Sequence, residues 1–243
     1  MSDRCKVWEA RELYEGDKAE FPDKLVLFRN EFRGYVEPLD ALSFASTHRF
    51  TYDKDGKLAC DKGEMRRLIP GSKQSWTQVP NVSIYEWHKR DSADLAIYVA
   101  KSTLSLPGIF RGHDADKEYS ETVVRMASES IRNATDSFSS SIRDKVKDSG
   151  IDAYTDSLGI VCSAENSPAY AKHVATCAAH TVINISHRAA DVASYAATAA
   201  SWAIEAVSCF CCEDIESARF GVVGQINHWI KRRIETRKRE AGE

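Results

Sequence analysis

The chain has 243 residues, of which 43% are hydrophobic and 28% are charged, and its formal net charge is −3. This composition is typical of a globular protein and argues against wholesale disorder, while the small net charge does not favour a general nucleic-acid coat or a strongly acidic mimic. The first twenty residues are charged where a signal peptide would be apolar, and we find no apolar run of about eighteen residues. We therefore expect a cytoplasmic protein without a membrane segment.

Residues 1–115 contain five of the six prolines together with mixed turn and strand signals, which predicts a small α+β region. Residues 7–14 and 23–33 are predicted as short helices, the second beginning after Pro22. Residues 48–52 and 57–60 flank an Asp-Gly turn at 53–56, and this pattern predicts a β-hairpin.

Two later segments of this region are short apolar runs. Residues 82–87 and 95–99 are predicted as strands, although residues 93–102 fit a helix equally well because short apolar runs do not separate the two states.

Residues 116–243 show a helical period and contain one proline, so we expect a mainly α-helical, alanine-rich bundle with a basic C-terminal tail. From Ser120 onward apolar residues recur three or four apart, and Gly150 is expected to end this run. The chain as a whole is thus predicted to be α+β, with a region at 1–115 followed by the bundle at 116–243.

A second helical run is predicted from Asn166-Ser167-Pro168, where Asn166 or Ser167 is suited to cap the helix and Pro168 to its first turn. It continues to about residue 209, which is too long for one rod in a domain of this size, so a break is expected near 186–188. The last helix is predicted at 215–239.

Alanine pairs between Ala169 and Ala206 predict buried, closely spaced helices, because a methyl side chain lets neighbouring backbones approach. One narrow polar line remains at near-heptad spacing, and we call it the polar seam. Its candidate binding residues are His173, His180, His187 and Asp191. Imidazoles beside Cys177 suggest a soft metal such as zinc, whereas the favoured interpretation is an interhelical polar contact. No catalytic residue, metal ligand set or cofactor is assigned.

The segment at 187–202, with the sequence HRAADVASYAATAASW, resembles alanine-rich helical proteins of bacteriophages and bacterial accessory genomes, some labelled as candidate immunity proteins. The resemblance covers about residues 168–210 and departs from that texture in the cysteines after 208 and in the isoleucine-rich stretch at 182–185. It implies a phage-encoded or accessory setting and gives no mechanism.

Three functions follow from these patterns. The first is a protein-binding or inhibitory protein that occupies a surface of a host or defence protein. Its candidate contact residues are Trp76, Tyr85 and Trp87, which alternatively belong to the core, together with Arg232 and Arg233. The alternatives are an enzyme or ligand-binding protein that uses the polar seam, and a nucleic-acid contact through the basic C-terminal helix. Assembly into a homo-oligomer is left open.

Overall fold

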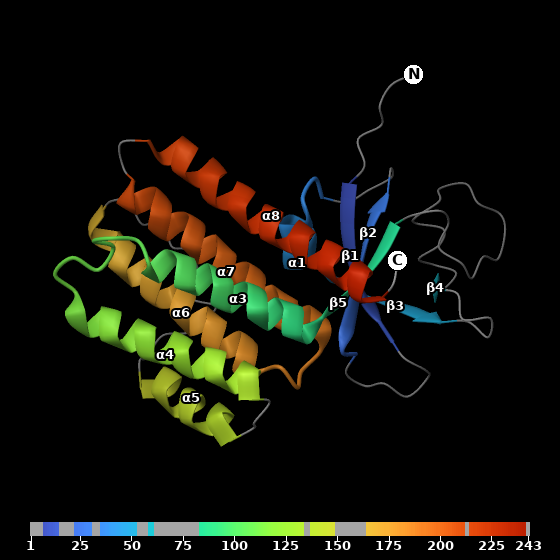
Figure 1. Ribbon diagram of the computed structural model, residues 1–243, viewed down its shortest axis with the longest axis horizontal. Helices are drawn as coiled ribbons and strands as arrows, with labels where there is room; N and C mark the ends of the chain where they lie inside the picture. The colour runs from blue at the N-terminus through green and yellow to red at the C-terminus, as the bar shows by residue number, and fades with distance from the viewer. Residues whose placement is uncertain are drawn as a thin grey trace. The chain divides into compact units, whose positions relative to one another are not determined.

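The computed structural model describes residues 7–14, 22–30, 35–52, 58–60, 83–133, 137–148, 164–211 and 214–241. The protein is α+β, with a five-stranded sheet formed by its N-terminal part and a helical C-terminal half (Figure 1). Two compact units are present. Unit 1 contains Met1–Lys89, His187–Ser194 and Ile230–Glu243, and unit 2 contains Arg90–Ser186 and Tyr195–Trp229.

The sheet of unit 1 has the strand order β4-β3-β1-β2-β5. β1 runs parallel to β3, and the other neighbouring strands pair antiparallel. The strands are β1 (Val7–Leu13), β2 (Lys24–Asn30), β3 (Ser46–Tyr52), β4 (Leu58–Cys60) and β5 (Ser83–His88). A short helix, α1 (Pro38–Ser43), precedes β3.

The helices predicted at 7–14 and 23–33 are wrong, because Val7–Leu13 forms β1 and Lys24–Asn30 forms β2, while residues 31–33 lie outside the described residues. Both strands have a neighbour on each side, and β1 is buried from Trp8 to Leu13 on both of its faces. A strand covered on both faces loses the alternation of apolar and polar residues that would mark it in the sequence. The spacing of Leu25, Val26 and Phe28 fits a helical face as well, although these residues belong to a strand.

The remaining predictions for this region agree with the structure. The hairpin is confirmed, since β3 pairs with β4 from Phe50 opposite Cys60 to Tyr52 opposite Leu58, while its turn at 53–57 lies outside the described residues. β5 confirms the strand at 82–87. The ambiguous segment at 93–102 is helical and belongs to α3 (Lys89–Leu104).

The helices of the C-terminal half lie largely where the sequence predicts them. The expected break at 186–188 separates α6 from α7, and the run from Ser120 is two helices, α4 and α5, while Gly150 lies outside the described residues. Asn166 occupies the N-cap of α6 without a side-chain cap hydrogen bond, and Pro168 lies in the first turn. The bounds are α4 (Asp114–Asn133), α5 (Ser137–Asp148), α6 (Ser167–Ile183), α7 (Ala189–Phe210) and α8 (Ile215–Ala241), with a 3-10 turn η1 (Ala164–Asn166) before α6.

The division into units differs from the expected boundary at 115/116. Unit 2 already begins at Arg90, because α3 is a helix that packs with α4 and α6. Residues 187–194 and 230–243 belong to unit 1, so α7 and α8 each contribute residues to both units.

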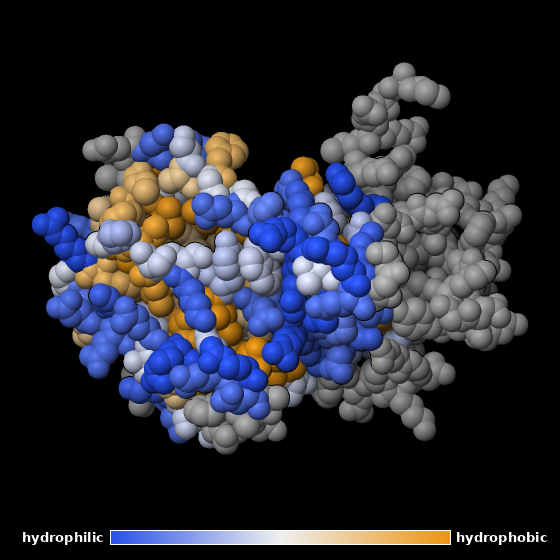
Figure 2. Space-filling view, in the orientation of Figure 1, coloured by the Kyte–Doolittle hydropathy of each residue, from blue (hydrophilic) through white to orange (hydrophobic). Residues whose placement is uncertain are grey.

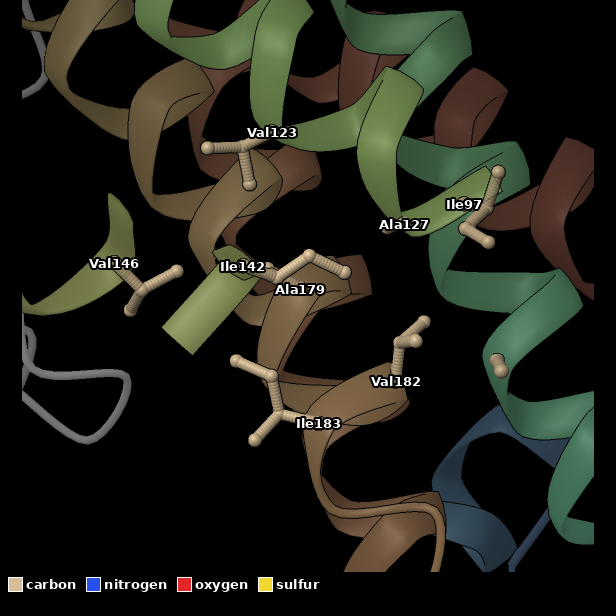
Figure 3. Packing of buried hydrophobic residues seen from close by; sticks show 9 residues of the cluster. Ile97, Val123, Ala127, Ile142, Val146, Ala179, Val182 and Ile183 are labelled. Atoms are coloured by element: carbon tan, nitrogen blue, oxygen red, sulfur yellow. The ribbon is translucent and has the colours of Figure 1, made fainter. Parts of the chain in front are cut away.

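Unit 2 has a tightly packed core in which four helices meet (Figure 3). Ala127 of α4 and Ala179 of α6 are fully buried there, where a larger side chain would push the helices apart. The branched residues around them are Ile97 of α3, Val123 of α4, Ile142 and Val146 of α5, and Val182 and Ile183 of α6. The alanine-rich stretch is thus confirmed as buried helix. Among the described helices, none combines the length and apolarity needed to cross a membrane.

Candidate functional site

The first half of the polar seam lies on α6, where His173 and His180 each stack on an aromatic ring of α7. The ring centroids of His173 and Trp202 are 4.7 Å apart with an interplanar angle of 19°. Those of His180 and Tyr195 are 5.7 Å apart with an angle of 13°. Both imidazoles therefore serve as packing surfaces between two helices, as the favoured interpretation of the seam expects.

His173 occupies an apolar environment in this stack. Tyr170 also stacks on Trp202, with centroids 5.4 Å apart, and the Nδ1 atom of His173 is buried without a hydrogen-bond partner. Burial lowers the pKa of His173 below its ordinary value, and the nearby charge of Lys172 lowers it further. The imidazole is thus held in its neutral form at neutral pH.

Cys177 lies between the two histidines along α6 and is fully buried. Burial raises the pKa of the Cys177 thiol to about 12, so the sulfur stays protonated at neutral pH. A protonated thiol is neither a metal ligand nor a nucleophile. Within the described part of the chain, no group of three or more histidine, cysteine, aspartate or glutamate side chains is arranged to hold a metal ion.

His187 and Asp191 lie outside α6. Both belong to unit 1, whereas His173 and His180 belong to unit 2. The chain leaves helical geometry between the end of α6 at Ile183 and the start of α7, so the near-heptad line of the sequence is not one continuous face. Of the four candidate residues of the polar seam, His173 and His180 both lie on α6 and stack on aromatic rings of α7.

Sequence reasoning missed a buried ion pair in unit 1. Glu12 of β1 is fully buried, and its carboxylate accepts hydrogen bonds from Arg188 Nε at 3.3 Å and Nη2 at 2.9 Å. It also accepts the Ala190 backbone N–H at 3.3 Å and the Tyr14 hydroxyl at 3.0 Å. Ala190 lies in the first turn of α7, where a carboxylate favourably faces the helix dipole. The pair joins β1 to the start of α7 within unit 1.

Unit 1 exposes a cluster of large apolar side chains, which we call the aromatic patch and define as Tyr35, Val36 and Phe44. Their exposed fractions are 37%, 65% and 65%. The rings of Tyr35 and Phe44 stack, with centroids 5.1 Å apart and an interplanar angle of 13°. Side chains of this size are normally covered by other protein surface, so the patch is the leading candidate for a contact site.

The aromatic patch is fixed in place by its own unit. The backbone of Tyr35 pairs with that of Trp8 of β1, with N-to-O distances of 2.5 and 2.7 Å in the two directions. Leu39 and Leu42 of α1 are buried and anchor the helix between Val36 and Phe44. The patch is therefore organised before any partner arrives, which reduces the entropy lost on binding.

Charged residues flank the aromatic patch. Lys231 Nζ of α8 lies 2.6 Å from Glu37 Oε2, next to Val36 in the chain. Partial burial raises the pKa of Asp40 in α1, and the negative charge of Glu37 raises it further. An apolar centre with a charged margin is the usual composition of a protein contact surface.

The contact residues predicted from the sequence take different positions. Trp87 is 1% exposed and belongs to the core, as the alternative for it stated, and Trp76 lies outside the described residues. Tyr85 is half-buried, with the Trp8 ring 5.7 Å away and Lys238 Nζ 4.5 Å from its ring centroid. In the C-terminal helix, Arg232 is exposed and Arg233 is half-buried.

Comparison of the chain with protein-family models, curated proteins and solved structures found no match. The resemblance of residues 187–202 to alanine-rich phage proteins thus remains a prediction. The aromatic patch offers apolar and aromatic surface for contact.

Proposed function

We propose that this protein acts by binding another protein and that the aromatic patch is the contact surface. The supporting observation is the distribution of exposed large apolar residues. Among the described residues there are four of them, and three, Tyr35, Val36 and Phe44, form the patch, while Phe220 lies in unit 2. Clustered apolar exposure marks binding surfaces, and aromatic anchors supply much of the binding free energy.

The patch also suggests the chemistry of its partner. The stacked rings of Tyr35 and Phe44, with Val36 next to Tyr35 in the chain, call for an apolar hollow on the partner. The Lys231–Glu37 ion pair calls for a polar margin around that hollow. A partner that is a host or defence protein, as the phage-like segment suggests, would be inhibited when its own functional surface is covered.

The proposal is tested with the double variant Val36→Asp/Phe44→Asp. Two carboxylates in the centre of an interface would be desolvated without counterions, so we expect capture of a stoichiometric partner from a bacterial lysate to be lost. Phe220→Asp is the matched control, because it places the same charge at a 74% exposed phenylalanine of unit 2. Thermal melts of all variants should agree with the wild type, since the substituted residues are exposed.

Two outcomes would contradict the proposal: capture of the same partner by the double variant, or loss of the partner in Phe220→Asp alone. Sedimentation of the purified protein over a range of concentrations covers the remaining case. If the protein self-associates and the double variant alone is monomeric, the partner is a second copy of this chain.

A further inference from the structure

Unit 2 contains a groove that the aromatic patch does not involve. It lies between the last turn of α3, the loop at 105–113 and the exposed side of α4. Two adjoining hollows of about 360 Å³ each make up the groove, and they share Leu104, Ser105 and Glu121. Each hollow is within the size range of small-molecule sites.

The floor of the first hollow is apolar. Val124 of α4 is 3% exposed and Leu104 of α3 is half-buried, and both line the hollow. Apolar surface is visible between hydrophilic side chains over α3 and α4 (Figure 2). A ligand with an apolar body would remove the exposed part of Leu104 from water and rest against Val124.

The rim of the same hollow carries more cationic than anionic side chains. Arg125 Nη1 lies 3.2 and 3.3 Å from the two carboxylate oxygens of Glu129. Glu121 Oε1 lies 4.0 Å from Nζ of Lys117, which lines the second hollow. The carboxylates on the rim are thus already engaged.

Lys101 and Arg132 also line the hollow and are exposed. Neither forms an ion pair or a side-chain hydrogen bond with any residue that the structure describes. The rim therefore keeps two cations whose charge is not matched by a carboxylate.

The wall formed by the loop is well defined. Ile109 and Phe110 are 2% and 6% exposed, so the loop is anchored to unit 2 at its centre. Gly108 and Gly112 have φ angles of 86° and 80°, which side-chain-bearing residues rarely adopt, and Arg111 N donates to Gly108 O at 2.9 Å. The groove is consequently shaped by backbone turns as well as by side chains.

From this geometry we infer that the groove binds a small amphipathic organic anion. The apolar body lies on Val124 and Leu104, and the negatively charged head group lies between Lys101 and Arg132. An anion held by two cations at an exposed rim gains a modest electrostatic free energy, while the apolar floor provides the rest. The inference concerns unit 2 and does not depend on the proposed protein contact.

The probe is anilinonaphthalene sulfonate, which combines an anionic head group with apolar rings and fluoresces when its rings leave water. We expect saturable binding of one molecule per chain, weakened about fivefold by Lys101→Gln and about fivefold by Arg132→Gln. Arg143→Gln, at an exposed arginine of α5 that does not line the groove, is the matched control and should leave binding unchanged. Binding should also weaken when the salt concentration is raised.

Competition separates the charged head group from the apolar body. Decanoate should displace the probe, and decanol, which has the same chain without the charge, should displace it much less. The inference is overturned if both groove variants bind the probe as the wild type does, or if decanol competes as well as decanoate. It is also overturned if Val36→Asp/Phe44→Asp abolishes the fluorescence, because the probe would then be bound at the aromatic patch.

Discussion

The most remote partner of a buried polar side chain lies farther along the chain in β1 of unit 1 than in α6 of unit 2. In α6, Thr181 Oγ1 donates to Cys177 O at 2.8 Å and Thr176 Oγ1 donates to Lys172 O at 3.0 Å, four residues away in each case. Thr176 Oγ1 also lies 3.2 Å from the hydroxyl of Tyr119, 57 residues away. In β1, the carboxylate of Glu12 depends on a guanidinium 176 residues later. Unit 2 thus combines local hydrogen bonds with a core of closely packed side chains, whereas β1 of unit 1 adds to its local pairs one partner from far along the chain, Arg188.

The largest expected effect is in unit 1. Arg188→Ala leaves the buried Glu12 carboxylate without its guanidinium, and we expect a loss of about 3 kcal/mol in the free energy of unfolding. Arg188→Lys, which keeps the charge and loses the two-pronged geometry, should lose less. Urea denaturation measures both.

Arg143→Ala is the control for this experiment, because it removes an exposed arginine of α5 and should stay within about 0.5 kcal/mol of the wild type. Equal losses in the Arg188 and Arg143 variants would show that Glu12 does not need its remote partner.

The next effect concerns volume in unit 2. Ala179→Leu inserts three carbon atoms where α6 packs against Ile142 and Val123, and overpacking should cost about 2 kcal/mol. Ala169→Leu makes the same change at an exposed position in the first turn of α6 and should cost less than about 0.5 kcal/mol. If the two variants were equally stable, the alanines would not be limiting the helix spacing.

The smallest effect is a dependence on pH. The folded-state pKa of His173 is lowered, so the unfolded chain takes up a proton first as the pH falls. Stability contributed by the neutral imidazole is thus complete above the unfolded pKa of about 6.5 and is lost as the pH falls below that value. His173→Gln should flatten the decline in unfolding free energy between about pH 7 and pH 5, and an unchanged decline would place the titrating group elsewhere.

The helical half was predictable because its signals are local. Alanine propensity, the start at Pro168 and the three-to-four spacing each act within one or two turns, and they located α6, α7 and α8. The hairpin formed by β3 and β4 was predictable for the same reason, since an Asp-Gly turn is a local feature.

β1 and the candidate contact site were not predictable in this way. β1 buries Glu9, Arg11 and Glu12, and the adjacent charges at Arg11 and Glu12 interrupt the apolar alternation of the segment. The exposure of Val36 and Phe44 depends equally on what fails to cover them, which no local pattern encodes. A useful signal was available at Trp8 and Ala10, which alternate with Glu9 and Arg11 at the two-residue period of a strand.

The separation of Glu12 and Arg188 along the chain also matters during synthesis on the ribosome. A ribosome that adds about 5 to 20 residues per second needs roughly 10 to 35 s to travel the 176 residues between them. For that time the nascent first strand carries a carboxylate whose counterion has not yet been synthesised. All five strands of the sheet lie between Val7 and His88, so they are synthesised before Arg188, and the Glu12 carboxylate gains its guanidinium partner last.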